Sequence, residues 1–398
     1  MTHDPIPRAI RITMAMYWLQ PMTIGGWLAL IPHIKGDLGL SKADLAVALL
    51  GAPFALLLAL QVAGPIVSRF GVRRTIMAGF VIQPIAAMFP LFANSQIGLF
   101  VALMAFGASL AVMEVGINVY AGRVERRAGR SIMSRCHGFW SLGLMVGSFF
   151  VAQVGLTLMQ AQGAVALASG VAGLVISRAA VRFPGEPEET APPRRSWRAT
   201  PVALLPIGLF MFAFTLTEGA MADWAAVHLA ELQPGGGIEP GLAVTIFAGA
   251  MAAGRFMGDA LNNALGPVGL GRVSALLATV GLLLLIIPLP LGLTFVGFAL
   301  TGVGIAAGYP LGISAVAALD VEYEASNIAI ISTMALCGFL AGPPLIGFLA
   351  EAFSLRVGFA AVIPFLAAAL FLAAWVRPSV HILPGSKAET PESGGIDS

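Results

Sequence analysis

Long apolar stretches follow one another along almost the whole chain, separated by short polar segments. Apolar residues make up 58% of the 398 positions and charged residues only 11%. Soluble domains usually carry about 25% charged residues, so this chain lacks the charge to cover a water-exposed surface of its size. An apolar stretch of about 20 residues crosses a hydrocarbon core of about 30 Å as an α-helix. The pattern therefore predicts an all-α, polytopic membrane protein.

Twelve spans are predicted, in two groups of six. They lie at about residues 10–34, 43–68, 74–93, 96–121, 135–159, 162–181, 201–229, 240–264, 271–289, 291–318, 325–350 and 355–376. Between the sixth and the seventh lies VRFPGEPEETAPPRRSWRAT, which is polar and rich in proline, as linkers are. We expect an N-terminal six-helix bundle at 1–181, a cytoplasmic linker at 182–200, a C-terminal six-helix bundle at 201–377 and a disordered cytoplasmic tail at 378–398.

Basic residues predict the orientation. With the N-terminus inside, only Lys35, Lys42 and Arg356 of the 22 Lys and Arg residues fall on the outer side. The inner side collects Arg8, Arg11, Arg69, Arg73, Arg74, Arg123, Arg126, Arg127, Arg130, Arg135, Arg178, Arg182, Arg194, Arg195, Arg198, Arg255, Arg272, Arg377 and Lys387. Cytoplasmic loops of membrane proteins carry an excess of Lys and Arg, so we expect both termini in the cytoplasm.

The two halves also repeat a pattern after their second helix. GPIVSRFGVRRT follows the second span and GRFMGDALNNALGPVGLGR follows the eighth, and internal repeats are typical of transporters with a site between two bundles. Gly64, Arg69, Gly71, Arg73 and Arg74 match the loop signature of the major facilitator superfamily, which nearly the whole chain resembles. The resemblance implies alternating access, with helices one, four, seven and ten lining a central cavity.

One position departs from that signature, because Ser68 stands where the family usually has Asp. The Asp normally joins a cytoplasmic charge network of the outward-facing state, so we expect a weaker network here, with Arg69, Arg73 and Arg74 as gating residues. The segments NVYAGRVERRAGRSIMSRCHGFWSLG, EGAMADW and GRFMGD resemble a bacterial inner-membrane branch related to fucose permeases and to a rhizopine-catabolism membrane protein. This resemblance implies a multi-pass protein of the cell inner membrane.

Two carboxylates lie inside apolar spans. Glu114 is in the fourth span, nine residues before Arg123, or about 13 Å along a helix, and Asn118 shares its face at i+4. Glu218 is in the seventh. A charged residue at the centre of a membrane helix costs roughly 2.5–3.5 kcal/mol, unless it faces water, finds a partner or takes up a proton. We predict that Glu114, Asn118 and Glu218 bind a proton or substrate; structural hydrogen bonds between helices are the alternative.

Further binding candidates lie on helices one and ten. Gln20, Thr23 and Trp27 fall at i, i+3 and i+7, and an amide beside an indole is a platform for a sugar or polyol; ordinary packing is the alternative. Tyr309, next to Pro310, is predicted at a helix break.

Five more polar residues are gating candidates near helix ends. Arg255 and Asp259, at i and i+4 on helix eight, are expected to form an ion pair, either structural or substrate-binding. Asp223, beside Trp224, is expected at an outer gate or at the membrane interface. Arg135 and His137 begin helix five at the cytoplasmic edge, where we expect a gate or a structural role. Glycines on helix eleven (Gly338, Gly342 and Gly347) are interpreted as packing and hinge positions.

Sequence signatures of enzymes are absent. The chain has no P-loop, no H-E-x-x-H and no G-x-S-x-G, and its two cysteines, Cys136 and Cys337, have neither metal-ligand spacing nor a catalytic setting. We therefore expect no cofactor, no metal and no nucleic-acid partner.

The predicted function is secondary active transport by a monomer. We expect proton-coupled symport of a small polar solute, and the resemblance to fucose permeases implies a sugar or polyol. Proton-coupled efflux of an amphipathic compound is the alternative. A non-transporting membrane sensor is less favoured, because it predicts an output domain larger than polar segments of about 20 residues.

Overall fold

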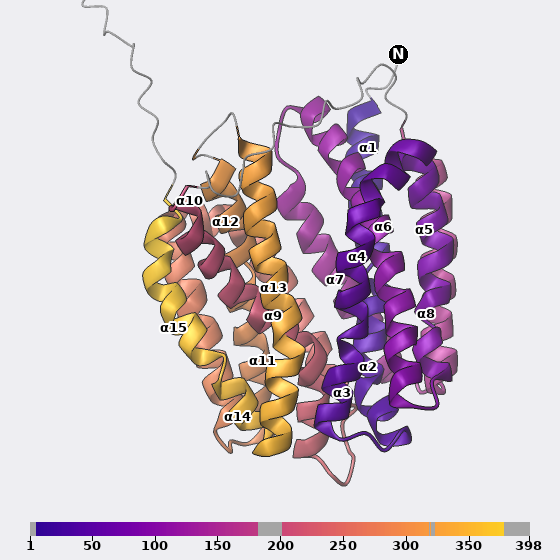
Figure 1. The fold of residues 1–398 in the computed structure, drawn as a ribbon, viewed down its shortest axis with the longest axis vertical. Helices are drawn as coiled ribbons and strands as arrows, with labels where there is room; N and C mark the ends of the chain where they lie inside the picture. The colour runs from indigo at the N-terminus through magenta and orange to yellow at the C-terminus, as the bar shows by residue number, and fades with distance from the viewer. Residues whose placement is uncertain (1–4, 182–200, 318, 320–322, 378–398) are drawn as a thin grey trace, which may run out of the picture.

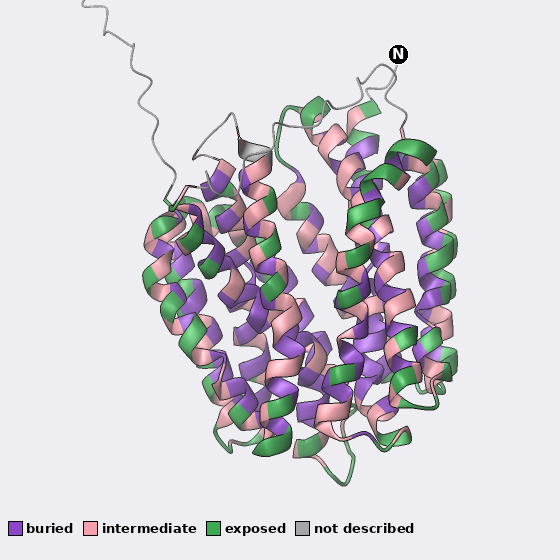
Figure 2. Cartoon of the chain, viewed as in Figure 1, coloured by how far each residue is buried: buried purple, intermediate pink, exposed green. Residues whose placement is uncertain are grey.

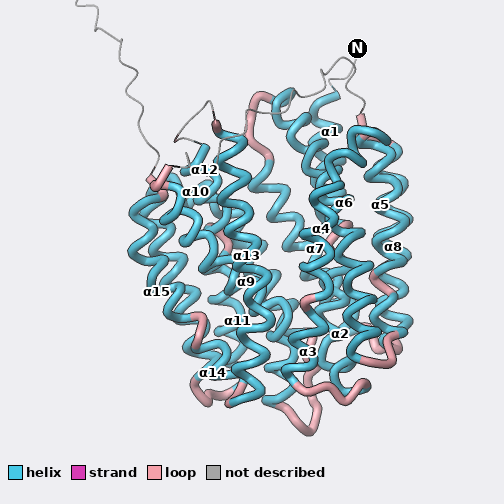
Figure 3. The backbone as a smooth tube through the Cα atoms, viewed as in Figure 1, coloured by secondary structure: helices cyan, strands magenta, loops and turns pink. Residues whose placement is uncertain are grey.

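The structure is a computed structural model that describes residues 5–181, 201–317, 319 and 323–377. Within these ranges the chain forms helices and short connections, without a strand (Figure 3). The predicted linker at 182–200 and the predicted tail at 378–398 lie outside the described residues. In chain order the helices are α1 (Pro5–Leu19), α2 (Met22–Asp37), α3 (Lys42–Leu49), α4 (Gly51–Phe70), α5 (Val72–Ala86), η1 (Phe89–Phe92), α6 (Gln96–Ala128), α7 (Met133–Gln153), α8 (Leu158–Arg178), α9 (Leu204–Leu232), α10 (Leu242–Ile286), α11 (Leu291–Ile305), α12 (Gly308–Ala317), α13 (Glu324–Ala352), α14 (Leu355–Ala360), α15 (Ile363–Leu372) and η3 (Ala373–Trp375).

Membrane-length segments account for most of the fold. Among the described residues, nine helical segments are long and apolar enough to cross a membrane. One of them, α10, consists of two helices that meet at Gly266. The pair α1–α2 is interrupted only at Gln20–Pro21, and α7 has 21 residues, so both also have the length of a span. The predicted all-α membrane fold is confirmed, and the segments fit the twelve predicted spans.

The helices fall into two groups that lie side by side in Figure 1. We call α1–α8 the first half and α9–α15 the second half; most of the first half is on the right of the view and most of the second half on the left. Helix α1 begins at the top of the view. Exposed arginines lie in its first turns (Arg8) and in the last turns of α4 (Arg69) and α6 (Arg126). This end is called the arginine-rich end, and the other the opposite end.

Two glycines make equivalent turns at the arginine-rich end. Gly71, between α4 and α5, has φ 82° and ψ 143°; Gly266, within α10, has φ 67° and ψ 164°. Glycine adopts positive φ without the steric cost of a Cβ atom. Both glycines follow the second span of a half, so the repeat predicted from the sequence is present in the backbone.

Close helix crossings hold each half together. A Cβ atom on Gly147 of α7 would lie 1.9 Å from the Met22 carbonyl oxygen of α2, and one on Gly338 of α13 would lie 2.5 Å from the Phe212 carbonyl oxygen of α9. A larger residue would therefore push these backbones apart. The position of Gly338 agrees with the packing role predicted for it.

The two halves are tightly joined at the opposite end, where α13 packs on α3. A Cβ atom on Gly347 would lie 2.3 Å from the Cβ of Ala46. The Lys42 ammonium lies 2.9 Å from the Glu231 carboxylate, and the Lys42 backbone N–H donates to Glu351 at 2.8 Å. Figure 2 shows many buried residues in this lower part of the molecule. In this conformation the seam between the halves is closed at the opposite end.

Candidate functional site

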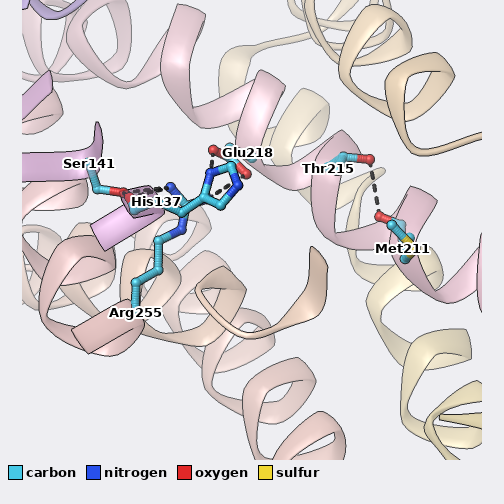
Figure 4. A network of polar contacts seen from close by, with 6 residues as sticks. All are labelled: His137, Ser141, Met211, Thr215, Glu218 and Arg255. Carbon is cyan, nitrogen blue, oxygen red and sulfur yellow. Dashed lines mark hydrogen bonds and ion pairs between the residues drawn. The ribbon is translucent and has the colours of Figure 1, made fainter. Parts of the chain in front are cut away.

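A buried arginine joins the two halves in the interior. The Arg255 Nη2 of α10 donates to Glu218 Oε1 of α9 at 3.2 Å, and its Nη1 donates to Ser141 Oγ of α7 at 2.5 Å (Figure 4). The Arg255 and Glu218 side chains are only 7% and 15% exposed. Glu218 belongs to the second half and Ser141 to the first. One guanidinium therefore holds a carboxylate within its own half and a hydroxyl across the seam.

The predicted ion pair between Arg255 and Asp259 is wrong. Asp259 is exposed, and in the described part of the chain the carboxylate beside Arg255 is that of Glu218. The i, i+4 spacing allows a pair on the helix surface, but the Arg255 side chain points inward. A buried guanidinium without a counter-charge is strongly unfavourable, and Glu218 supplies that charge.

Aromatic side chains surround this ion pair. The Arg255 Cζ lies 5.9 Å from the ring centroid of Trp140, within the range of a cation–π contact. The His137 ring lies 5.9 Å from that of Tyr17 in α1 and 6.3 Å from that of Tyr309 in α12. His137 was expected to begin helix five at the cytoplasmic edge; α7 begins at Met133, one turn before His137, and the His137 ring lies between aromatic rings of the two halves.

Tyrosine hydroxyls extend the polar network on both sides of the seam. Tyr17 donates to the Asn118 side-chain oxygen of α6, and Tyr309 exchanges a hydrogen bond with Ser332 of α13 at 3.2 Å. The predicted break in the tenth span lies at 306–307, between α11 and α12 and just before Tyr309. The first and second halves thus each bring one tyrosine to His137.

Glu114 has a different environment from Glu218. Its side chain is accessible rather than packed, and its carboxylate has no hydrogen bond or ion pair among the described residues. It lies within electrostatic range of Tyr17 and Tyr309, and Glu218 is also within range of Tyr309. One carboxylate from each half therefore acts electrostatically on the same tyrosine, and among the described residues only Glu218 is balanced by a cation.

The polar residues of the first span point into the first half. Gln20 and Thr23 are buried at the α1–α2 break. Gln83 of α5 donates to the Gln20 carbonyl at 2.8 Å and to the Thr23 hydroxyl at 2.9 Å, and Gln162 of α8 donates to the Thr23 carbonyl at 3.1 Å. Trp27 is also buried, at 4% exposure. Gln83 and Gln162 were not singled out from the sequence, although a glutamine within an apolar span is a detectable signal.

Asp223 and Trp224, which were predicted at an outer gate or at the membrane interface, have different environments. Asp223 is half-buried, with no hydrogen-bond or ion-pair partner among the described residues. Trp224 is fully buried and donates its indole N–H to the Pro343 carbonyl of α13 at 3.2 Å. Trp224 is therefore not a membrane-interface anchor, because its ring packs between helices of the second half. A gating role for Asp223 stays a prediction.

The predicted gating arginines of the first half have different environments. Arg73 donates to the Ser177 carbonyl at 3.4 Å and to the Arg178 carbonyl, at the C-terminal end of α8. Cationic side chains stabilise such free carbonyls. Arg69, Arg74 and Arg135 are exposed. Arg73 thus ties two helices of the first half together, while gating by the three exposed arginines stays a prediction.

Comparison with known proteins agrees with this fold. The Major Facilitator Superfamily profile matches residues 13–233 and 207–395. An uncharacterized MFS-type transporter of Yersinia pestis is 29% identical over 357 residues, or 88% of this chain and 91% of the relative. Membrane protein MosC of Rhizobium meliloti is 28% identical over 347 residues, covering 85% and 83%.

A solved structure shows the same fold at low identity. A mutant of the nucleoside transporter NupG has a TM-score of 0.73 at 13% identity, covering 92% of this chain and 99% of that one. The resemblance to fucose permeases stays a prediction. The family matches cover both halves, and the helical fold agrees with them. The chain belongs to the Major Facilitator Superfamily and is an MFS-type transporter.

Proposed function

We propose that this transporter moves a small polar solute, a sugar or polyol, by proton-coupled symport with alternating access. One observation carries the proposal: the Arg255 guanidinium joins Glu218 to Ser141 across the seam, while a second carboxylate, Glu114, has no cation partner among the described residues. Carboxylates, hydroxyls and an amide can together bind the several hydroxyls of such a solute.

The two contacts of Arg255 respond differently to a rocking motion of the halves. Its ion pair with Glu218 lies within the second half and can persist, whereas its hydrogen bond to Ser141 crosses the seam and must break when the halves separate there. Glu114, on the fourth span, is the group proposed to take up and release the coupling proton. Tyr17, Tyr309 and Asn118 are the proposed solute-binding groups around it.

We propose that the arginine-rich end faces the cytoplasm of a bacterial inner membrane. The exposed Arg8, Arg69, Arg74 and Arg130 support this orientation, because basic residues accumulate on the cytoplasmic side of membrane proteins. Both termini would then be cytoplasmic, and the closed seam at the opposite end would face outward. The chain would act as a monomer.

Charge movement on a solid-supported membrane tests the proposal. Reconstituted protein is given a panel of neutral sugars, polyols and inositol derivatives at two pH values, and wild type is compared with Glu114→Gln. We expect currents for one solute class that disappear in the variant. Symport would be contradicted, and efflux favoured, if the wild type gave no current with any compound of the panel and expressing cells were resistant to amphipathic compounds.

A further inference from the structure

Two ion pairs cross the seam between the halves at the opposite end, and their cations differ in chemistry. The Lys42 ammonium of α3 lies 2.9 Å from the Glu231 carboxylate of α9. The His33 Nε2 of α2 lies 3.4 Å from Glu239 Oε2, in the connection between α9 and α10. A lysine ordinarily keeps its charge at neutral pH, whereas a histidine ordinarily changes its charge between about pH 5 and 8. The second pair is therefore an ion pair only when His33 is protonated.

The connection that carries Glu239 has a defined shape of its own. Gly237 has φ 124°, a value that glycine adopts without the steric cost of a Cβ atom. The Gln233 side-chain oxygen accepts from the Ile238 N–H at 3.1 Å, and the Leu242 N–H donates to the Glu239 carbonyl at 3.0 Å. Hydrogen bonds on both sides of Glu239 thus fix the turn from which its carboxylate projects.

A close apolar contact places this turn against the first half. Gly241 follows Glu239 by two residues. A Cβ atom on Gly241 would lie 2.6 Å from the Cβ of Ala29 on α2 and 3.0 Å from the Cβ of Ala152 on α7. His33 follows Ala29 at i+4, on the same face of α2. The packing of the seam therefore brings the imidazole to the carboxylate, and separation of the halves at this end must part them.

Both side chains of this pair reach water. The His33 and Glu239 side chains are 33% and 53% exposed, and they line a cavity of about 330 Å³ at the seam. His33 can therefore exchange a proton with the compartment at the opposite end while the seam stays closed. In the orientation proposed above, this compartment lies outside the membrane.

The ionisable groups of α9, which packs on α2, have other surroundings. Glu231 is paired with Lys42, and Asp223 lies eight residues before Glu231, about 12 Å along the helix. His228 is buried and shares a hydrogen bond of 3.2 Å with the Leu285 carbonyl of α10, within the second half. These groups leave Glu239 as the carboxylate that contacts His33.

The other helices that pack on α2 contribute no charge at this level. They are α7, α8 and α10, and their segments near the opposite end, 141–165 and 241–254, contain no ionisable side chain. On α2 itself, Lys35 and Asp37 follow His33 and carry opposite charges. Protonation of His33 thus acts across the seam chiefly through its attraction to the carboxylate of the second half.

We propose that His33 and Glu239 form a pH-sensitive latch on the closed seam at the opposite end. Protonated His33 attracts Glu239 and stabilises the closed state. Above the histidine range this attraction is lost, while the pair of Lys42 with Glu231 persists. Because the pair forms only when the seam is closed, the closed state binds the proton on His33 more tightly than the open state does. Acid in this compartment therefore favours closure, independently of the proton exchange proposed for Glu114.

Distances between spin labels on the two halves test the latch. The labels are placed at positions 159 and 353, which are 40% and 72% exposed at the opposite end, in the full-length protein with Cys337→Ser and Glu114→Gln. The second substitution removes the proposed coupling carboxylate as a source of pH dependence. We expect the ratio of closed to open molecules to be higher at about pH 5.5 than at about pH 8, by up to about fivefold, the usual limit for a partly exposed ion pair.

Variants of the pair separate the latch from a general effect of pH. His33→Gln and Glu239→Gln should lose the pH response, and His33→Lys should stay closed at both pH values. Lys42→Gln is the matched control: it should lower the closed fraction at both pH values and keep the response. The positions of the pair are partly exposed, so folding is expected to survive. A distance distribution independent of pH, or a response that persists in His33→Gln, would overturn the proposal.

Titration of His33 by NMR provides a second measurement, which does not depend on how many molecules are open. The protein carries labelled histidine, and the His33 signal is assigned by its loss in His33→Gln. We expect the proton affinity of His33 to fall by up to about fivefold in Glu239→Gln. An unchanged titration midpoint in Glu239→Gln would overturn the proposal, because Glu239 would then not stabilise the protonated imidazole.

Discussion

Glu114 and Glu218 occupy the fourth and seventh spans, and their surroundings differ more than their helices do. Glu218 is buried against Arg255, which also reaches Ser141 of the first half. Glu114 is accessible and has no ion-pair partner among the described residues. Both carboxylates act electrostatically on Tyr309. The repeat thus extends to the backbone, whereas the charge balance is asymmetric.

The difference suits the two carboxylates to two functions, holding a buried arginine in place and exchanging a proton. A carboxylate whose charge is balanced by a buried arginine fixes the position of that arginine. A carboxylate without a cation can gain or lose a proton while the rest of the network stays in place. We infer that Glu218 organises the contact between the halves and that Glu114 changes its charge during the cycle.

Breaking the ion pair is expected to have the largest effect. Arg255→Met leaves Glu218 buried without a counter-charge, which typically costs about 3–5 kcal/mol, and it removes the hydrogen bond to Ser141. We expect a large drop in the melting temperature of the purified protein and loss of solute uptake into proteoliposomes.

The double variant Arg255→Met with Glu218→Gln is the control for this prediction. Removing both charges should restore most of the thermal stability, because no buried charge is left unpaired, while uptake stays absent. Normal uptake by the single variant would show that the ion pair does not belong to the transport site.

Overpacking the seam at the opposite end should have the next largest effect. In Gly347→Val the new side chain would meet Ala46 and the Lys42 carbonyl of the first half, and overpacking costs about 1–3 kcal/mol. We expect the population to shift toward a state that is open at this end. Spin labels at positions 37 and 235, in a Cys337→Ser background, should report a longer distance.

Gly36→Val is the matched control, because a Cβ atom at Gly36 meets nothing within 4 Å. Its distance distribution should equal that of the unsubstituted protein. The idea of a closed seam would be abandoned if Gly347→Val and Gly36→Val gave the same distances.

The smallest effect is expected from the partly exposed ion pair at the same end. Lys42→Gln removes the contact with Glu231, whose side chain is 40% exposed. Such pairs contribute about 0.2–1 kcal/mol, so the conformational shift should be clearly smaller than in Gly347→Val. Lys35→Gln, at a lysine without an ion pair among the described residues, serves as control; a larger shift in Lys42→Gln than in Gly347→Val would contradict this order.

The spans and the repeat could be predicted because lipid imposes length and apolarity on each helix separately. The glycine-containing segments after the second and eighth spans were visible in the sequence, and in the structure Gly71 and Gly266 of these segments have positive φ. Glu114 and Glu218 stood out because a charge within an apolar span is rare. These are all signals carried by one helix at a time.

The partners within the site could not be predicted in the same way. Spacing along one helix suggested Asp259 for Arg255, but the arginine pairs with Glu218, which lies 37 residues earlier on another helix. The contacts of His137 with Tyr17 and Tyr309 likewise depend on how three helices pack. Thr23 was predicted to bind solute, but in the structure its hydroxyl and its carbonyl accept hydrogen bonds from Gln83 and Gln162 of the first half.

The most direct test compares Glu114→Gln with Glu218→Gln in proteoliposomes for one transported solute. Proton-driven accumulation is measured beside counterflow, in which solute exchanges without net proton movement. We predict that Glu114→Gln loses accumulation and retains counterflow, whereas Glu218→Gln loses both because Arg255 is left without its counter-charge. Identical behaviour of the two variants, or proton-driven accumulation by Glu114→Gln, would contradict the division of tasks between the two carboxylates.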